Sequence, residues 1–304
     1  MTTHRVSPNQ TLAENPAQDW MAALGSAHIA VLGAGGCVGR RVLELASRAG
    51  AKVIGVRRGG SSPIAGYETV NVDLASPHAG QQLGDTGVSV VISAAPIFLA
   101  SNALSRIGQS GGVRVVACSS MSARAKLNSP STADRQVAHA LLQAEEVILE
   151  RNSQAIVIRP TMIYGHPMTR NVASIQRFAR RFRFLAVPAC ATGLRQPVHA
   201  HDVAAALLAA AACGAGGRRY ELGGGERVSF IDMMSRIAAS ESVPLFTLPS
   251  PGAARLARIA CASGLSRVGG VLHRLRQDQC AENCETVRDL GVNPRPFEPQ
   301  VSEA

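Results

Sequence analysis

The sequence contains 304 residues, of which 46% are hydrophobic and 17% are charged. This length and composition support one large or two coupled globular domains with a sizeable core, and they exclude a generally disordered chain. The formal net charge is +10, and arginine supplies nearly all of it because Lys52 and Lys126 are the only lysines. Aromatic residues make up only 4%, which argues against a nucleic-acid-binding surface with stacking side chains. Arginine binds phosphate in bidentate fashion, so the charge favours a phosphorylated small molecule as the partner.

The cysteine pattern and the first residues bear on the compartment. The seven cysteines are dispersed and odd in number, which argues against the disulfide framework of a secreted protein. Residues 1–27 are polar and lack the apolar segment of a signal peptide, so we expect a loose leader there. The most apolar run, residues 203–213, is about half as long as the roughly 20 residues of a membrane-spanning helix. These features predict a reduced cytoplasmic protein without an integral membrane segment.

A glycine-rich stretch follows the first apolar run. Ile29–Leu32 reads as a strand, and a helical pattern begins at Arg40. The glycines between them are Gly33, Gly35, Gly36 and Gly39. A strand that passes through a glycine turn into a helix N-terminus presents free N–H groups and a positive dipole end to an anion. Glycine is required where a side chain would block the turn or the approach of a phosphate, so this stretch predicts nucleotide binding.

Apolar runs then alternate with helical patterns. The expected strands are residues 52–56, 67–72, 88–92, 113–117 and 155–158, with a long helix over 133–151 before the last of them. This alternation predicts a parallel sheet with helices on both faces, and ligands of such sheets bind at the carboxyl ends of the strands.

After Gly165 the alternation breaks down. We expect a helix over residues 203–213 with Asp202 as its N-cap, a short strand over 219–222, and a helix over 230–240 capped by Ser229. The expected domains are the leader at 1–27, a dinucleotide-binding domain at 28–165, and mainly a substrate-binding lobe at 166–304, with residues 202–223 returning to the first domain.

Several motifs occur in a recognisable order. They are Gly33-x-x-Gly36-x-x-Gly39, Asp73-Leu74, Ala94-Ala95-Pro96, Ser119-Ser120, the run RPTMIYG at 159–165 and the run RQPVHAHDV at 195–203. With this order and spacing, the chain resembles the extended short-chain dehydrogenases/reductases of the NAD(P)-dependent epimerase/dehydratase type over about residues 28–300. The resemblance implies an α/β fold, a Rossmann-type doubly wound parallel sheet with a small C-terminal substrate lobe.

The resemblance also implies which residues hold the cofactor. The glycine turn would bind the pyrophosphate and Asp73 with Leu74 the adenine, while Ala94, Ala95, Ser119 and Pro160 complete the expected site. A carboxylate at the end of the second strand would bind the ribose hydroxyls of NAD, but this chain has Arg57 and Arg58 there. Cations suit a 2′-phosphate, so we predict NADP, with NAD as a possible cofactor and two surface arginines as the alternative interpretation.

The catalytic pattern departs from the family. The family uses a Tyr and a Lys four residues apart on the helix after the fifth strand, where the ammonium lowers the phenol pKa. Aligning Glu146 with the family's usual glutamate places Ala138 and Leu142 at these two positions, and neither can transfer a proton.

Substitute catalytic groups are available after the strands. The candidates are Ser120, Lys126 and Tyr164, with His139 as a further acid/base candidate; Tyr164 can equally be a packing residue. On this view the protein is an epimerase, dehydratase or reductase that transfers a hydride. The alternatives are a non-catalytic NADP-binding protein, similar to the accessory subunit of respiratory complex I, or a redox-sensing regulator.

The second half of the chain holds the candidate substrate residues. In the family, an Asn and an Arg of this region hold the diphosphate of a nucleotide-sugar, and Asn171 and Arg195 fall at matching places. A salt bridge within the loop is the alternative role of Arg195. His199, His201 and Asp202 lie close in sequence, but we predict no metal site because this segment leads into a helix. Family members often dimerise through the helix expected at 133–151.

One dense basic cluster, RFARRFRF at 177–184, mixes arginine with phenylalanine. This composition suits a surface helix at an interface or at an anionic membrane. We expect instead a solvated helix face with Phe178 and Phe182 buried.

Overall fold

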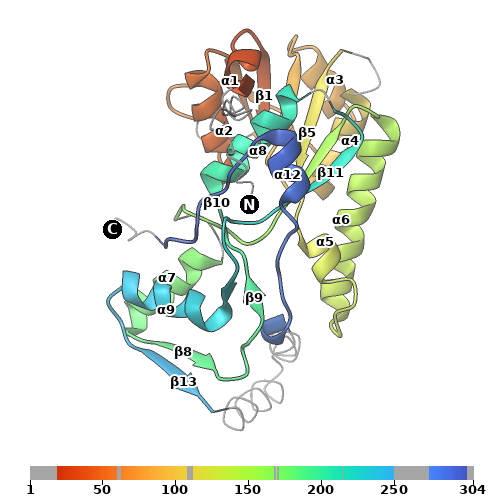
Figure 1. The fold of residues 1–304 in the computed structure, drawn as a ribbon. Helices are drawn as coiled ribbons and strands as arrows, with labels where there is room; N and C mark the ends of the chain where they lie inside the picture. The colour runs from red at the N-terminus through yellow and green to blue at the C-terminus, as the bar shows by residue number, and fades with distance from the viewer. Residues whose placement is uncertain are drawn as a thin grey trace, which may run out of the picture.

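The fold is centred on one seven-stranded parallel sheet, described here from a computed structural model (Figure 1). The structure describes residues 19–59, 63–107, 112–167, 169, 171–213, 215–249 and 274–299. The strand order is β11-β6-β5-β4-β1-β2-β3, and every pairing within this sheet is parallel. The predicted Rossmann-type sheet is therefore confirmed.

The strands of the central sheet are β1 (His28–Leu32), β2 (Lys52–Arg57), β3 (Glu68–Asn71), β4 (Val90–Ser93), β5 (Arg114–Cys118), β6 (Ile156–Pro160) and β11 (Arg218–Leu222). The helices around it are α1 (Asp19–Leu24), α2 (Cys37–Arg48), α3 (Ala79–Gly84), α4 (Ile97–Ile107), α5 (Ser122–Ala125), α6 (Thr132–Arg151), α8 (Ala200–Ala212) and α12 (Cys284–Leu290). The remaining elements are β7 (Ile163–Tyr164), β8 (Leu185–Pro188), β9 (Leu194–Arg195), β10 (Val198–His199), β12 (Val228–Ser229), β13 (Leu245–Leu248), α7 (Val172–Phe182) and α9 (Phe230–Ser240).

The inner strands of the sheet are mostly apolar and buried because helices cover both of its faces, whereas the edge strands β3 and β11 carry polar and charged residues. Buried residues of α2 and α8 form one core cluster with one face, and those of α3, α4 and α6 form a second cluster with the other. Since all strands run in one direction, the segments after them gather at one edge of the sheet. The strand order reverses between β1 and β4, so the crevice there is where ligands of such sheets bind.

A small lobe lies beyond this edge and contains α7, α9 and the short parallel pair β8–β13 (Figure 1). Its own core cluster includes Tyr164, Met233, Ile237 and Phe297. The chain then returns, because α12 packs against β11 and α8 and Leu290 joins the first core cluster of the sheet. The division of the chain at residue 165 stays a proposal, and this return shows that part of 166–304 belongs to the sheet.

Local structure differs from expectation at the start of two helices. Helix α8 begins at Ala200 and its N-cap is His199, whose Nδ1 accepts from the His201 N–H at 3.2 Å. The predicted cap at Asp202 is wrong because that carboxylate instead accepts from the backbone N–H and guanidinium of Arg295 at 2.8 to 3.1 Å. Helix α1 lies within the expected loose leader and buries Trp20, whereas residues 1–18 lie outside the described part of the chain.

Candidate functional site

The glycine turn between β1 and α2 has the geometry of a phosphate-binding turn. Helix α2 starts at Cys37 after Gly36, which has an extended backbone and no side-chain cap. Its first turn contains no acidic residue, so the N–H groups there keep a positive field that nothing in that turn neutralises. A Cβ added at Gly35 would meet no atom of the described residues within 4 Å. The turn therefore leaves open space for an anion.

Two other glycines of the turn are required by close backbone approach. Gly33 has φ of +72°, and a Cβ there would lie 2.7 Å from the Ala95 nitrogen. A Cβ on Gly39 would lie 2.3 Å from the Gly33 carbonyl oxygen. The turn after β1 thus contacts the turn after β4 and locks α2 onto β1, which brings Ala94 and Ala95 to the predicted cofactor site.

Cys37 lies at the first position of α2 and was not among the predicted site residues. Burial raises the pKa of its thiol, against the lowering effect of hydrogen bonds from the N–H groups of Cys37 and Val38. Burial also raises the pKa of Cys118, at the end of β5, to about 12. Both thiols are therefore protonated at neutral pH and add no charge to the crevice. The only sequence signal for Cys37 was its place inside the glycine motif.

The residues expected around the adenosine end lie where β2 and β3 stop. Arg57 is the last residue of β2 and is half-buried, and Arg58 after it is exposed. Asp73 is exposed and its carboxylate accepts from the Ala75 N–H at 3.0 Å, while Leu74 is half-buried against the second core cluster. These four residues therefore lie after neighbouring strands at the ligand-binding edge.

The segment after β5 is fastened to the end of β6. The N–H of Ser119 donates to the Ile158 carbonyl at 2.7 Å, and the N–H of Met121 to the Pro160 carbonyl at 2.9 Å. The Ser119 hydroxyl donates to Glu145, whereas the Ser120 hydroxyl accepts from the Ser122 N–H at 3.1 Å at the start of α5. Ser119 is thus tied to a helix, and Ser120 lies at the loop that enters α5.

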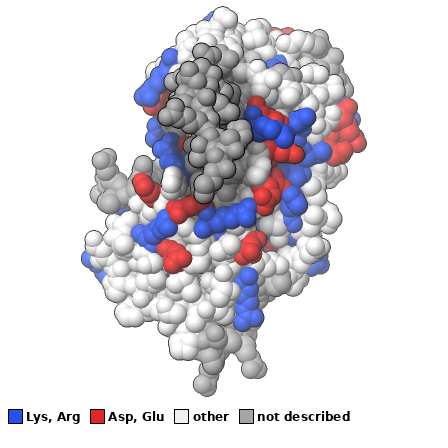
Figure 2. Space-filling view, in the orientation of Figure 1, with Lys and Arg blue, Asp and Glu red and all other residues white. Residues whose placement is uncertain are grey.

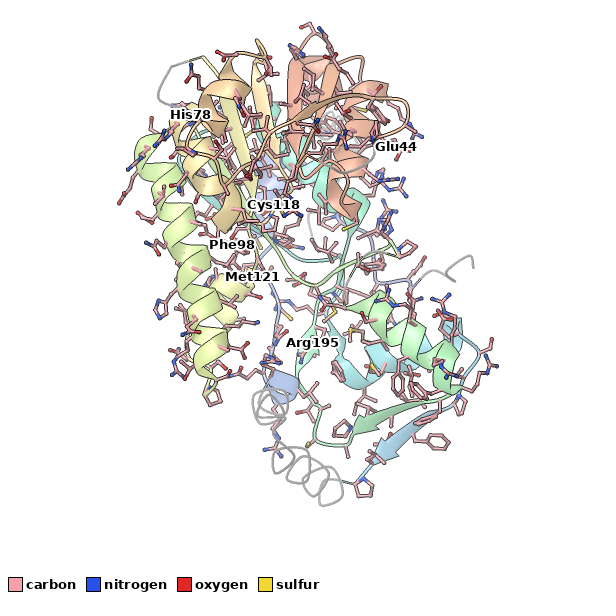
Figure 3. All side chains as sticks on the ribbon, turned by 180° about the vertical axis from the view of Figure 1, so that it is seen from behind. Glu44, His78, Phe98, Cys118, Met121 and Arg195 are labelled. Carbon is pink, nitrogen blue, oxygen red and sulfur yellow. The ribbon has the colours of Figure 1, made fainter. Side chains whose placement is uncertain are left out.

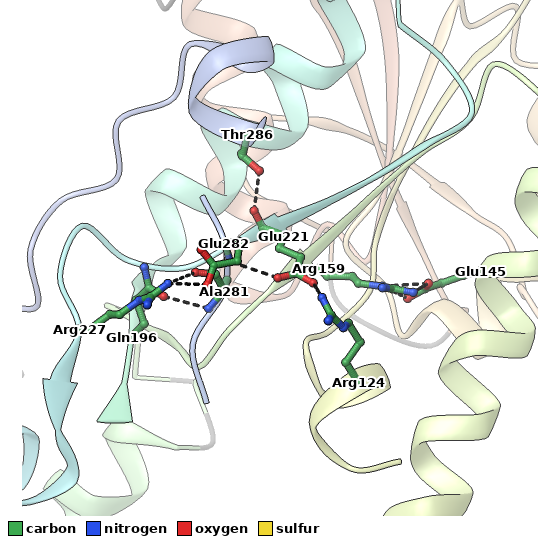
Figure 4. Close-up of polar contacts among 9 residues, drawn as sticks. All are labelled: Arg124, Glu145, Arg159, Gln196, Glu221, Arg227, Ala281, Glu282 and Thr286. Carbon is green, nitrogen blue, oxygen red and sulfur yellow. Dashed lines mark hydrogen bonds and ion pairs between the residues drawn. The ribbon is translucent and has the colours of Figure 1, made fainter. Parts of the chain in front are cut away.

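Glu145 of α6 is fully buried and forms a bidentate ion pair with Arg159 of β6, with the Arg159 Nε 3.0 Å from both carboxylate oxygens (Figure 4). Glu146 is exposed and pairs with Arg219. The buried carboxylate is the structurally fixed one of the two. Counting from Glu145 instead of Glu146 would assign the Tyr and Lys positions to Val137 and Leu141, which also lack a group that transfers protons.

The two positions aligned with the family's Tyr and Lys hold apolar side chains that pack in the interior of the sheet domain. Ala138 is fully buried, and Leu142 packs against the second core cluster. His139 between them is exposed. Helix α6 therefore offers no buried acid/base from these two positions.

Lys126 and Tyr164 both have structural partners. Lys126 follows α5, and its ammonium lies 3.0 Å from the Asp134 carboxylate of α6, which also pairs with Arg274. Tyr164 is buried in the core of the small lobe, where its hydroxyl donates to the Pro296 carbonyl at 3.0 Å and accepts from the Glu298 N–H at 3.3 Å. Burial raises the pKa of the phenol, which is opposite to what a catalytic tyrosine needs.

The two expected substrate residues have different surroundings. Arg195 of β9 is buried, and its guanidinium donates to the carbonyls of Leu194, Gln277 and Arg274 at 2.7 to 2.8 Å. It thereby binds the chain at 274–277 instead of a carboxylate within its own loop. Asn171 is exposed at the start of α7, and its side chain does not cap that helix.

Figure 3 shows Cys118 and Met121 at the end of the sheet that faces the small lobe, with Arg195 on the lobe's side. On the face shown in Figure 2, lysine and arginine side chains alternate with acidic ones across the middle of the molecule. An open cavity of about 710 Å³, lined in part by His78, Arg106 and Arg151, lies elsewhere, where α4 and α6 end. That cavity contains none of the predicted site residues.

Three further features are the charge of His199, metal binding and membrane-spanning helices. Burial and the nearby Arg295 lower the pKa of His199 to about 4, so its ring is neutral at physiological pH. Among the described residues no group of three or more His, Cys, Asp or Glu side chains is placed to hold a metal ion. Within the same residues, no helix combines the length and apolarity needed to cross a bilayer.

No protein-family model matches the sequence, and no curated protein matches it significantly. Solved structures do match it. The epimerase Mth375 of Methanothermobacter thermautotrophicus has a TM-score of 0.71 at 18% identity, over 94% of this chain and 93% of that chain. The UDP-glucose 4-epimerase of Thermotoga maritima, solved with UDP-glucose, has a TM-score of 0.67 at 15% identity, over 89% and 94%. The dTDP-glucose 4,6-dehydratase of Bacillus anthracis, in complex with NAD, has a TM-score of 0.66 at 14% identity, over 90% and 93%.

These matches show the fold of the chain over nearly its whole length. The predicted resemblance to extended short-chain dehydrogenases/reductases of the epimerase/dehydratase type is confirmed at that level. Activity does not follow from a fold, so the site itself has to carry the functional argument.

Proposed function

We propose that this protein is an NADP-dependent, epimerase-like oxidoreductase that acts on a nucleotide-sugar-type substrate. The single observation that carries the proposal is the glycine turn. Its open space at Gly35, its close backbone approach at Gly39 and its uncapped helix α2 fit a pyrophosphate. Ala94 and Ala95 follow β4 at the reversal of the strand order, and Ser119 follows the neighbouring strand β5, so we expect the nicotinamide beside them.

The residues proposed to hold the cofactor are Gly33, Gly35, Gly36, Gly39, Arg57, Arg58, Asp73, Leu74, Ala94, Ala95, Ser119 and Pro160. The bound nicotinamide would supply a hydride acceptor or donor. The chain's own part is to orient substrate and to move a proton. Ser120 is the first candidate for the residue that moves this proton. It lies in the loop after β5, and its hydroxyl oxygen accepts from the Ser122 N–H, which leaves the hydroxyl hydrogen to be donated.

The preference for NADP rests on Arg57 and Arg58. Arg57 ends β2 and Arg58 follows it, and two guanidinium groups suit the extra phosphate of NADP better than the ribose hydroxyls of NAD. Three of the similar structures contain NAD. The preference of this chain is therefore a departure that we propose from its own residues.

Two similar structures contain UDP-glucose, which supports a nucleotide-sugar substrate here. Asn171 is exposed and can contact such a diphosphate. Arg195 would contact it only by exchanging some of its carbonyl partners, because its guanidinium already binds three of them. Lys126 and Tyr164 would likewise have to release Asp134 and Pro296 in order to act on a substrate.

These engaged side chains favour a second candidate function, which is NADP binding without turnover. Ala138 and Leu142 cannot replace the Tyr–Lys pair, and Tyr164 has a raised pKa in a packed environment. A cofactor-binding accessory or redox-sensing protein needs the glycine turn and needs no acid/base.

An absorbance assay separates the two functions. Purified protein is mixed with NADPH or NADP and a panel of nucleotide-sugars, and the nicotinamide absorbance is followed. Steady turnover with one of them supports the oxidoreductase, whereas cofactor binding without turnover on any of them supports the accessory function. Lys126→Ala should lower turnover if Lys126 acts at the site, while Lys52→Ala, the change of the only other lysine, should leave it unchanged. Equal rates in both variants would remove Lys126 from the site.

We further propose a cytoplasmic homodimer that packs through α6. The support is the family's frequent use of this helix as a dimer contact, and Val137 on α6, which is 43% exposed, offers an apolar side chain to that contact. Val137→Asp should convert the dimer to a monomer in sedimentation equilibrium. A monomeric wild-type protein would contradict the proposal.

A further inference from the structure

Four of the seven phenylalanines of the chain lie exposed on the small lobe. Their exposed fractions are 44% for Phe178, 54% for Phe182, 38% for Phe184 and 54% for Phe246. The expectation that Phe178 and Phe182 are buried is therefore wrong. The buried face of α7 is made instead by Val172, Ala173, Gln176 and Ala179, so the helix has a second apolar stripe that faces away from the core.

The four rings form one continuous surface, which we call the phenylalanine patch. The ring centroids of Phe178 and Phe182 are 4.5 Å apart, those of Phe178 and Phe184 are 6.1 Å apart, and those of Phe184 and Phe246 are 6.2 Å apart. The patch spans α7, the residues after it and β13, all of which belong to the small lobe (Figure 1). Contiguous exposed apolar surface of this kind indicates a contact with another molecule.

Arginine surrounds the phenylalanine patch. Arg177, Arg181 and Arg183 are exposed, and the Arg181 guanidinium lies over the Phe182 ring at 5.9 Å. Among the described residues, Glu241 forms an ion pair with Arg180 at 3.4 Å, and its side chain is almost fully buried. Its carboxylate therefore adds little negative charge to the surface.

The sequence around the phenylalanine patch is free of acidic residues. Residues 172–188, which include α7 and the residues after it, contain four arginines and no Asp or Glu, and residues 242–249 contain no charged residue. The segments that supply the patch therefore carry positive charge only. An occupant of this surface must be both apolar and anionic.

We propose that the phenylalanine patch docks the protein onto an anionic lipid bilayer. Phenylalanine rings partition into the boundary between headgroups and acyl chains, and arginines beside them bind the acidic headgroups. The rings lie against one another instead of standing apart as separate platforms, which favours one apolar surface over the stacking of successive nucleic-acid bases. The dense charge of one sign disfavours a second copy of the same face, because like charges would meet.

This proposal is independent of the proposed function, because the patch shares no residue with the cofactor site. Binding at a membrane surface requires no spanning helix. It places the small lobe towards the lipid.

Co-sedimentation of the full-length protein with vesicles tests the proposal. We expect binding to vesicles of phosphatidylcholine mixed with phosphatidylglycerol, little binding to phosphatidylcholine alone, and weaker binding as salt is raised. The double change Phe182→Ser/Phe246→Ser should lower the partition coefficient by about tenfold or more. Phe98→Ser is the matched control, because Phe98 is 55% exposed but lies on α4, and it should bind like the wild type.

The charge contribution is tested by a second pair. Arg181→Gln/Arg183→Gln should lower binding to the anionic vesicles by about tenfold, whereas Arg48→Gln/Arg288→Gln, at two exposed arginines on other helices, should leave it unchanged. Insertion is followed separately with Phe182→Trp. The emission of the tryptophan introduced there should shift to shorter wavelength on anionic vesicles, against the constant signal of Trp20, the only native tryptophan, which is 9% exposed.

Several outcomes would overturn the proposal. One is a wild-type protein that does not bind anionic vesicles. Another is equal vesicle binding by the wild type and the folded Phe182→Ser/Phe246→Ser variant, together with an unchanged emission of Phe182→Trp on the same vesicles. Binding of a single-stranded oligonucleotide, with no vesicle binding, would assign the patch to nucleic acid. A wild-type dimer that becomes monomeric in the same double variant, again without vesicle binding, would assign it to a second copy.

Discussion

Gly35 and Gly39 lie in the same turn but are held to glycine by different constraints. At Gly39 the constraint is internal, because the backbone of Gly33 fills the space of a Cβ. At Gly35 nothing in the described part of the chain occupies that space, so only a bound phosphate would exclude a side chain there. The two residues therefore separate the stability of the turn from its function.

We predict that Gly39→Ala destabilises the fold by about 2 kcal/mol or more, because overpacking against backbone cannot relax by a rotamer change. Gly35→Ala should leave the free energy of unfolding within about 0.5 kcal/mol of the wild type, yet weaken cofactor binding by about tenfold or more. Urea unfolding and cofactor titration measure the two quantities. Gly84→Ala, where a Cβ also has open space at the end of α3, should change neither. Unweakened binding in Gly35→Ala would move the phosphates away from this turn.

His199 gives the protein a pH-dependent stability. Its pKa falls from 6.5 to about 4 in the folded protein. Between these pH values, His199 binds a proton in the unfolded chain but not in the folded chain. The contribution is complete above about pH 6.5 and is lost as the pH falls towards 4, with an upper limit of about 3 kcal/mol. The ring also faces Tyr164, the Asp202–Arg295 ion pair and His201, whose pKa is likewise lowered, mainly by burial.

We predict that His199→Asn loses less stability than the wild type between about pH 7 and about pH 5, as measured by urea unfolding at each pH. The exposed His139 serves as the control. His139→Asn should retain the full wild-type loss. An identical loss in His199→Asn and wild type would show that His199 does not titrate as described.

For helices and strands, features set by neighbouring residues could be predicted from the sequence, whereas contacts between distant residues could not. The strands and the cap at Ser229 followed from the local pattern, because an apolar run or a hydroxyl next to a helix start acts on its own neighbours. The role of Asp202 could not be predicted, since its partner Arg295 is 93 residues away in sequence. The exposure of Phe178 and Phe182 was likewise hidden, because α7 has two apolar stripes and sequence does not tell which one meets the core.

The cap of α9 provides a test at this scale. The Ser229 hydroxyl accepts from the Asp232 N–H at 3.0 Å and donates to its carboxylate at 2.7 Å. The matching hydroxyl of Ser131 accepts from the Asp134 N–H at 3.4 Å. Ser229→Ala should therefore cost about 1 kcal/mol of unfolding free energy, and Ser131→Ala about half of that or less. A larger loss at Ser131 in urea unfolding would reverse this ranking.

For the whole molecule, sequence predicted the sheet and the edge at which the segments after its strands gather. It did so because a parallel sheet gathers the ends of its strands by geometry alone. It did not predict which candidate side chains are already engaged. Lys126, Tyr164 and Arg195 acquire their partners only when α6 and the chain at 274–298 fold against them. The catalytic part of the site was therefore less predictable than the cofactor part.

The glycine turn, Arg57 at the end of β2 and Arg58 after it are together proposed to bind NADP. Calorimetric titration of the full-length protein with NADPH and with NADH tests this proposal most directly, with Arg57→Glu/Arg58→Glu as the altered site and Arg48→Gln as the control. We predict tighter binding of NADPH than of NADH to the wild type and to Arg48→Gln, and loss or reversal of that preference in the double variant. Tighter binding of NADH than of NADPH to the wild type would show that Arg57 and Arg58 do not select NADP. No binding of either dinucleotide would show that the glycine turn is not a cofactor site.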